Sequence, residues 1–248
     1  MKSDSHIHIL PGIDTGPATP EEAAAMFHRA YEDGVRTFVA SPHYSADRET
    51  IGEFLVKRRA SVSRLAKACG KRIYRVQFLA SAEVQLFPGV AALPDLLALC
   101  IPGTTLLPVA FAPSCGISND IMRELAHLVQ KRGLTPMFCH LERLHALFLP
   151  ESFEALLSFT HGVFCVSASA FPSGELAAAI IRAIGKGKRF LLASNAHNNT
   201  KRPPLLVPRQ TDALDGPSHF AFRRLSRDTD AFFLSLRREN APRMTFVT

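Results

Sequence analysis

The sequence lacks the long apolar segments that mark membrane-spanning and exported proteins. No uninterrupted apolar run reaches the ~18 residues that a membrane helix needs, so we expect no membrane span. After Met1 the sequence goes straight into polar residues, Lys2 to His6, and has no apolar signal core, which argues against export by that route. The five cysteines are odd in number and none has C-x-x-C spacing. We therefore expect free thiols and a reducing, cytoplasmic compartment.

A dense tract of one charge is also missing. The 29 Lys and Arg residues outnumber the 22 Asp and Glu residues by seven, but the positive charges are scattered along the chain. Without a basic tract interleaved with aromatic residues, nucleic-acid binding is disfavoured, and the basic balance fits an acidic substrate better. No G-x4-G-K-[ST] motif is present, which argues against a nucleotide kinase.

Apolar strand-like runs alternate with helical stretches throughout the 248 residues. The first helix shows the local signals clearly, with Thr19 as N-cap, Pro20 at the first helical position and Glu22 completing a capping box. This alternation predicts an α/β fold with parallel strands, and seven strand–helix steps favour a seven-stranded barrel in one domain, 1–248. The predicted strands are Ser5–Leu10, Thr37–Ala40, Val76–Ala82, Thr105–Phe111, Thr135–Cys139, Val163–Ser167 and Arg189–Ser194.

Polar side chains occur where the predicted strands end. His6 and His8 alternate along the first strand, so both point to one face. In a parallel barrel the carboxyl ends of all strands meet at one mouth. We therefore expect one cluster there, built from His6, His8, Asp14, His43, Glu83, His140 and His197.

Imidazole and carboxylate are the usual ligands of Zn, Mn and Fe, so this cluster predicts a metal site. A single H-x-H pair is weak evidence, because histidines in half-buried strands are often satisfied by hydrogen bonds alone. Position strengthens the metal interpretation, since five of the ten histidines fall at strand ends.

Seven short segments resemble the motifs of one family. Asp4–Asp14 is similar to the opening motif of the PHP (polymerase and histidinol phosphatase) superfamily. More closely, the chain resembles the bacterial capsule-type, manganese-dependent protein-tyrosine phosphatases of that superfamily. The further matching segments run in order through nearly the whole chain: Ala40–Tyr44, Ala82–Val84, His140–Arg143, Ala193–Asn198, Arg202–Pro204 and Glu239–Pro242.

The resemblance implies a distorted seven-stranded (β/α)7 barrel of the PHP type with up to three metal ions at its mouth. It implies that Arg143 and Arg202 hold the phosphate. It also implies three sets of metal ligands. These are His6, His8, Asn195 and Glu83 for one ion, Glu83 and His140 for a second, and Asp14, His43 and His197 for a third.

Two positions depart from the family pattern. The family has Asp where this chain has Asn195, and it has Glu near the end of strand four, where we align Val109. An amide oxygen carries no charge and a valine offers no ligand atom. Because clustered cations need anionic ligands to offset their repulsion, we expect two divalent ions rather than three. Manganese is the expected metal, and iron and zinc accept the same ligands.

The sequence thus favours a metal-dependent phosphoesterase. Its expected activity is hydrolysis of phosphotyrosine by a metal-activated hydroxide, linked to capsule or exopolysaccharide biosynthesis. The expected partner is the phosphorylated tail of a tyrosine kinase of polysaccharide export. A small-molecule phosphatase of the histidinol-phosphate type is an alternative, because a fold does not fix its substrate. A second alternative is a degenerate binding protein that lost catalysis with its metal ligands.

Overall fold

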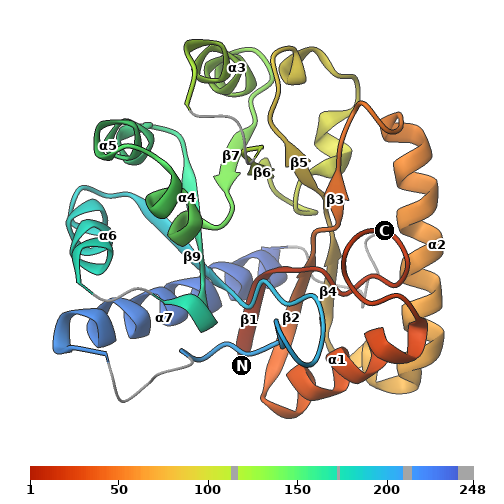
Figure 1. Ribbon diagram of the computed structural model, residues 1–248. Helices are drawn as coiled ribbons and strands as arrows, with labels where there is room; N and C mark the ends of the chain where they lie inside the picture. Colours follow the sequence, from red (N-terminus) through yellow and green to blue (C-terminus); the bar gives the residue numbers. More distant parts are fainter. Residues whose placement is uncertain (113–116, 172–173, 209–213, 240–248) are drawn as a thin grey trace.

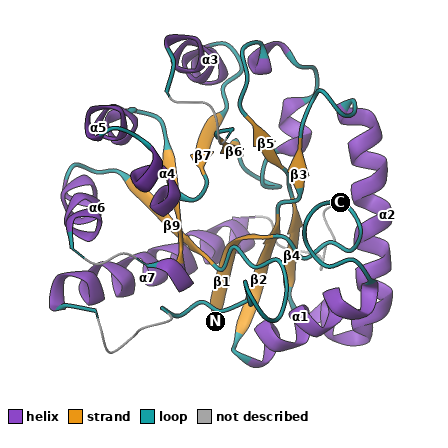
Figure 2. Cartoon of the chain, in the orientation of Figure 1, coloured by secondary structure: helices purple, strands orange, loops and turns teal. Residues whose placement is uncertain are grey.

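The computed structural model describes residues 1–112, 117–171, 174–208 and 214–239. Strands occupy the middle of the molecule and helices surround them (Figures 1 and 2). The strands are β1 (Lys2–Ile7), β2 (Val35–Ala40), β3 (His43–Tyr44), β4 (Gln77–Ala80), β5 (Glu83–Gln85), β6 (Leu106–Ala110), β7 (Thr135–Phe138), β8 (Val163–Ser167) and β9 (Arg189–Ala193). The α-helices are α1 (Pro20–Glu32), α2 (Ile51–Cys69), α3 (Asn119–Gln130), α4 (Leu141–Leu147), α5 (Pro150–Ser158), α6 (Glu175–Gly185) and α7 (Gly216–Glu239).

The helix starts follow from local chemistry. Thr19 caps α1 and forms the predicted reciprocal capping box with Glu22, and Pro20 occupies the first helical position. Thr50 and Glu53 make the same box at α2. Between β5 and β6 the chain forms two 3-10 turns, Val90–Ala92 and Leu96–Leu99. The last helix, α7, is the longest of the described helices, with 24 residues.

All strands pair in parallel, as predicted, but in two sheets. One sheet has the order β1-β2-β4 and the other β3-β5-β6-β7-β8-β9. The division arises because the chain bends after β2 and after β4. Strand pairing is interrupted between Ala40 and His43, where Pro42 has no N–H to donate, and again between Ala80 and Glu83, at the end of the third predicted strand. At the bends the hydroxyls of Ser41 and Ser81 lie 2.8 Å apart and hydrogen-bond each other.

The strand pairings thus give an α/β fold with parallel sheets, and they do not by themselves close the distorted seven-stranded barrel that we predicted. β1 and β9 lie side by side without a ladder, because side chains take the place of ladder partners. The carboxylate of Asp4 accepts from the Ser194 N–H at 2.8 Å, and the Ser5 hydroxyl donates to the Leu192 carbonyl at 2.8 Å. Backbone hydrogen bonds join the two segments only beyond β9, where the Asn195 N–H donates to the His6 carbonyl.

Apolar side chains pack on both faces of the strands. The outer core, between strands and helices, includes Val84, Val109 and Phe138. The inner core includes Met137, Cys139 and Leu191, and α7 adds Phe233 to it. Helix α7 thus covers the end of the strands opposite their carboxyl ends. Among the described residues, no helix is long and apolar enough to cross a membrane.

Candidate metal centre

The structure brings the predicted strand-end residues together. One group, which we call the deep group, contains His6, His8, Glu83 and His140, whose ligand atoms all lie within 4.8 Å of one another. His6 and His8 come from β1 and the residue after it, Glu83 begins β5, and His140 follows β7. All four residues are at most 9% exposed. His140 has a left-handed backbone (φ 59°) at the start of α4.

Imidazole nitrogens converge on one oxygen of Glu83. Its Oε2 lies 3.3 Å from His6 Nε2, 3.2 Å from His8 Nε2 and 3.4 Å from His43 Nε2. None of these contacts has hydrogen-bond geometry, and Oε2 is buried without a hydrogen-bond partner among the described residues. His6 Nε2 and His8 Nε2 also face each other at 3.0 Å. Buried imidazole nitrogens and a carboxylate oxygen that converge without hydrogen bonds are the arrangement expected of a cation-binding site.

A second set, the outer group, contains His8, His43 and His197. The His8 ring belongs to both groups and lies 3.9 Å from the His197 ring, centroid to centroid. The side chain of His43 is 46% exposed, so this group is open to solvent. Asp14 contacts two of the imidazoles: its Oδ2 lies 2.7 Å from His8 Nδ1 and 3.5 Å from His43 Nδ1. A carboxylate on the far nitrogen of a histidine is the usual support of a metal ligand.

Burial and neighbouring charges shift the pKa values of these groups in different directions. Burial alone would raise the pKa of Glu83, but His6 and His140 hold it well below its usual range. Burial lowers the pKa of His6 to about 4 and that of His197 to about 3. Burial also acts to lower the pKa of His8, but its hydrogen bond to Asp14 and the nearby charge of Glu83 raise it to about 9. At neutral pH the carboxylates are therefore ionised and His6 and His197 are neutral, which are the forms that bind metals, whereas His8 would have to release a proton to bind one.

Beside the deep group, Asn195 Oδ1 and Asp4 Oδ2 are also buried without hydrogen-bond partners among the described residues. Asn195 has a left-handed backbone (φ 52°), and its N–H donates to the His6 carbonyl beside the deep group. Burial raises the pKa of Asp4 to about 6. An unsatisfied amide oxygen next to the deep group fits the predicted role of Asn195 as an uncharged metal ligand.

The structure changes our account of the missing carboxylate in β6. Val109 is fully buried in the outer core, where it pairs with Val84 and Phe138 and not with the histidines. Strand alternation places Ala110, one residue later, on the opposite face. Val109 pairs with Phe138, so the residue that follows each of them, Ala110 or Cys139, lies on that opposite face. There Cys139 Sγ lies 3.7 Å from His6 Nδ1. Ala110, and not Val109, therefore faces the centre.

The two predicted arginines lie beside the centre. Arg143, in the first turn of α4, and Arg202, in the loop after β9, line one pocket of about 350 Å³. An Arg202 nitrogen lies 3.2 Å from His197 Nε2 and 3.3 Å from its Nδ1. The rest of the lining is polar as well: Glu142, Ser167, Ser169, Ser194, Asn195 and Lys201.

Sequence reasoning gave no role to Glu142 and Ser167, which line this pocket and contact each other. The Glu142 carboxylate accepts hydrogen bonds from the backbone N–H and the hydroxyl of Ser167, which fixes the segment next to Arg143. A signal for both was present, because Ser167 ends β8 and Glu142 lies between His140 and Arg143. The strand-end argument did not consider the residues at the ends of strands four and six. The predicted motif segment Asn240–Pro242 and Cys115 lie outside the described residues.

A cysteine nucleophile does not fit the structure. Cys69 and Arg75 have the C-x5-R spacing of cysteine-dependent phosphatases. Cys69, however, is buried at the end of α2, and burial raises the pKa of its thiol to about 12. A thiol that stays protonated at neutral pH is a poor nucleophile.

Comparison with known proteins gives one family. The family model described as "Capsular polysaccharide synthesis, CpsB/CapC" matches residues 2–211. The tyrosine-protein phosphatase CpsB of Streptococcus agalactiae is 30% identical over 148 residues, and the match covers 58% of each chain. The tyrosine-protein phosphatase YwqE of Bacillus subtilis is 26% identical over 210 residues, covering 79% of this chain and 77% of YwqE.

The fold has a counterpart among solved structures. A structure from a study of YwqE from Bacillus subtilis and CpsB from Streptococcus pneumoniae, described as unique metal-dependent tyrosine phosphatases, superposes with a TM-score of 0.65. The superposition covers 91% of this chain and 94% of the other, at 21% sequence identity. At this identity the likeness establishes a shared fold, and the matched part amounts to 58% of the length of CpsB from Streptococcus agalactiae.

Proposed function

The chain belongs to the CpsB/CapC family of capsular polysaccharide synthesis, and we propose that it is a metal-dependent protein-tyrosine phosphatase. The observation that carries this proposal is the convergence of three imidazole nitrogens on the buried Glu83 Oε2 without hydrogen bonds, next to a pocket lined by two arginines. Such a centre suits an anionic ester that must be bound and made electrophilic.

The deep group would hold one divalent ion through His6, His8 and Glu83, with Asn195 as an uncharged fourth ligand. The outer group, with Asp14, would hold another. Glu83 and His140 remain for a third ion, but no second carboxylate faces that position, because Ala110 stands there. We therefore propose two tightly bound ions, with manganese as the first candidate and iron or zinc as chemically acceptable replacements.

Each part of the site has a distinct task in hydrolysis. The metals would offset the charge of the phosphate and activate a water molecule. Arg143 and Arg202 would hold the phosphate oxygens with planar, bidentate hydrogen bonds. The short contact between Arg202 and His197 keeps that guanidinium at the edge of the outer group. Glu142, by fixing Ser167, positions the start of α4 and so the direction of Arg143.

We further propose that the two sheets are halves of one distorted barrel and that residues 1–248 act as one domain. Hydrogen bonds across the bends support the first point, since the Glu83 N–H donates to the Pro42 carbonyl and the Ser81 N–H to the Ala40 carbonyl. The backbone bond from His8 to Ala196 adds a contact between the outermost strands. Both sheets supply ligands to the deep group, which supports a single domain.

The proposed substrate is phosphotyrosine in the acidic, phosphorylated tail of a kinase of polysaccharide export. The net charge of +7 supports an acidic partner. We propose a cytoplasmic location, because the four described cysteines are free and buried, as expected in a reducing compartment.

The test combines metal analysis with two substrates, a phosphotyrosyl peptide and p-nitrophenyl phosphate, with and without added manganese. The proposal expects metal-dependent hydrolysis of both, with kcat/KM higher for the peptide. Arg143→Ala should lower kcat/KM about ten-fold or more, as expected for loss of a charge-assisted hydrogen bond worth ~1.5–3 kcal/mol. Hydrolysis of small esters alone would favour the small-molecule alternative. No hydrolysis with manganese, iron, cobalt or zinc would favour the binding-protein alternative.

A further inference from the structure

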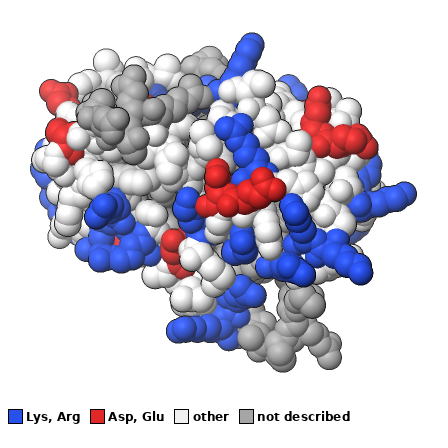
Figure 3. All heavy atoms as spheres, turned by 90° about the horizontal axis from the view of Figure 1, so that it is seen from below, with Lys and Arg blue, Asp and Glu red and all other residues white. Residues whose placement is uncertain are grey.

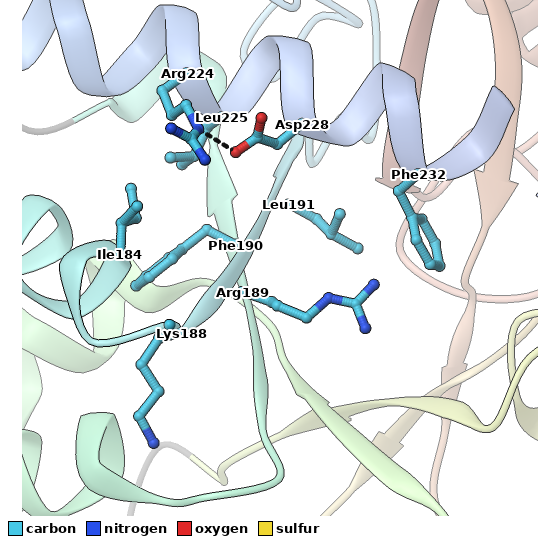
Figure 4. A pocket seen from close by; sticks show the side chains of 10 residues that line it. Ile184, Lys188, Arg189, Phe190, Leu191, Arg224, Leu225, Asp228 and Phe232 are labelled. Atoms are coloured by element: carbon cyan, nitrogen blue, oxygen red, sulfur yellow. Dashed lines mark hydrogen bonds and ion pairs between the residues drawn. The ribbon is translucent and has the colours of Figure 1, made fainter. Parts of the chain in front are cut away.

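A second pocket, of about 280 Å³, lies between α6, the start of β9 and α7 (Figure 4). Its lining comes from Ile184 at the end of α6, from residues 187–191 and from one side of α7. The pocket is remote from the metal centre, because Arg189 begins β9 and Asn195 follows its end. Six residues of extended chain span roughly 20 Å.

Positive charge predominates in this pocket. Lys188, Arg189 and Arg224 line it, and Asp228 is the single acidic residue among the lining residues. Asp228 is already shared, since it pairs with Arg224 and lies 3.7 Å from Arg227. The Lys188 ammonium donates to the carbonyls of Ser158 and Phe159, which hold it in place but do not neutralise its charge. Seen from below, this side of the molecule shows more Lys and Arg than Asp and Glu (Figure 3).

Arg189 is the cation that is free to bind a ligand. Its guanidinium carbon lies 5.2 Å from the centroid of the Phe232 ring, and Figure 4 shows the two side chains beside each other. No ion pair or hydrogen bond holds that guanidinium within the four described stretches of the chain. The ring orients the guanidinium at little entropic cost and leaves its N–H donors unused.

The floor of the pocket is apolar. Phe190, Leu191 and Leu225 are each at most 4% exposed, and Ile184 and Phe232 form walls. A volume of about 280 Å³ has room for one ring or a short chain, and little more. Cations around an apolar floor match a ligand with one anionic group and a small apolar body.

We propose that this pocket is a second binding site for a small aromatic anion, with the phosphate or carboxylate on Arg189 and the ring beside Phe232. Arg189 is the main anchor, since Arg224 is shared with Asp228. The site is separate from the metal centre and does not depend on the proposed phosphatase activity.

The absence of tryptophan from the chain allows a specific reporter. In the full-length Phe232→Trp variant, the only tryptophan stands in the pocket wall. Phenylphosphonate, whose carbon–phosphorus bond a phosphatase does not hydrolyse, is the probe, titrated at constant ionic strength. We expect a saturable change in fluorescence that Arg189→Ala weakens about ten-fold or more. Arg223→Ala is the matched control, because it removes an exposed arginine of α7 outside the pocket, and it should change Kd less than about two-fold.

Further titrations define the ligand. Inorganic phosphate should bind at least about ten-fold more weakly than phenylphosphonate, because it buries no ring. If the natural ligand is a free aromatic acid, a phosphotyrosyl peptide should bind more weakly than phenylphosphonate. If it is part of a polypeptide, the peptide should bind more tightly than phenylphosphonate. Arg143→Ala should leave the response unchanged, which distinguishes this site from the metal centre.

Chemical shifts in the unmodified chain give a second readout, free of any effect of the introduced tryptophan. Phenylphosphonate should shift the backbone amide signals of Leu191 and Leu225. Equal effects of Arg189→Ala and Arg223→Ala would overturn the proposal, as would the absence of both the fluorescence response and these shifts at millimolar probe.

Discussion

The deep and outer groups of the metal centre share His8 but differ in burial and in what surrounds them. Every deep-group residue is at most 9% exposed, and the pKa of the group's single carboxylate, Glu83, is held well below its usual range by His6 and His140, against the effect of burial. In the outer group, His43 is 46% exposed and an arginine lies against His197. The deep group therefore has the character of a tight cation site. The outer group is the open side of the site, where, on our proposal, a phosphate would reach metal and arginine together.

Removing the charge of Glu83 tests the deep group most severely. Glu83→Gln keeps the shape of the side chain but leaves buried imidazoles without their anion. Breaking a buried charged interaction costs ~3–5 kcal/mol, so we expect metal affinity and phosphatase activity to fall roughly a hundred-fold or more. Isothermal titration with manganese measures the affinity. Glu154→Gln, on the exposed side of α5, is the matched control and should retain wild-type affinity. Unchanged metal binding in Glu83→Gln would remove this residue from the centre.

Asp14→Asn tests the outer group. Asp14 supports His8 and His43 from their Nδ1 sides, and loss of such a partner lowers metal affinity about 10–100-fold. We expect the weaker of two binding steps to suffer more than the tighter one, which a two-site manganese titration resolves. A selective loss of the tighter step would reverse our assignment of the two groups.

Two substitutions in β6 test which residue faces the centre. Ala110→Glu should add a carboxylate beside Glu83 and His140 and tighten binding of an additional ion by about ten-fold, as expected for a charged ligand gained. Val109→Glu should instead bury a carboxylate among Val84 and Phe138 and lower the free energy of unfolding by several kcal/mol. Metal titration and urea unfolding separate the two effects. Tighter binding in Val109→Glu, with unchanged stability, would restore our original alignment.

The pH dependence of stability gives a smaller effect. Burial lowers the pKa of His197 to about 3 from an ordinary value near 6.5, so the folded state resists its protonation. Below pH 6.5 the unfolded chain takes up a proton that the folded state does not, and stability falls by about 1.4 kcal/mol per pH unit for this residue until about pH 3. Metal-free His197→Gln should therefore lose less stability than the wild type between pH 6.5 and 4.5 in urea unfolding. If stability falls equally with pH in the variant and the wild type, His197 takes up its proton at the same pH in the folded and unfolded states, and its pKa is not lowered.

Much of this site was predictable because one rule governs it. Parallel strands bring their carboxyl ends together, so the positions of His6, Glu83 and His140 in the sequence were enough to predict that they meet. The rule was applied to the ends of strands one, two, three, five and seven but not to the fourth and sixth, and Ser167 was missed for that reason. The boundaries of α1 were also predictable, because a capping box is a purely local signal.

Other features depend on contacts that no short segment encodes. The assignment of Val109 was wrong by one residue, and in a strand one residue changes the face entirely. The two-sheet pairing depends on bends at Pro42 and Ser81 and on side chains that replace ladder partners between β1 and β9. The pocket beside Arg189 needs helices α6 and α7 to pack around β9, and that packing is not visible in the sequence.

The central claim is that the deep group holds a divalent cation. Anomalous X-ray diffraction at the manganese edge, from crystals grown with manganese, tests this claim most directly. We predict a strong peak within ~2–2.5 Å of His6, His8 and Glu83, the range of metal–ligand bonds, and a weaker one beside His43 and His197. A peak beside the outer histidines alone, or no peak within bonding distance of Glu83, would contradict the account.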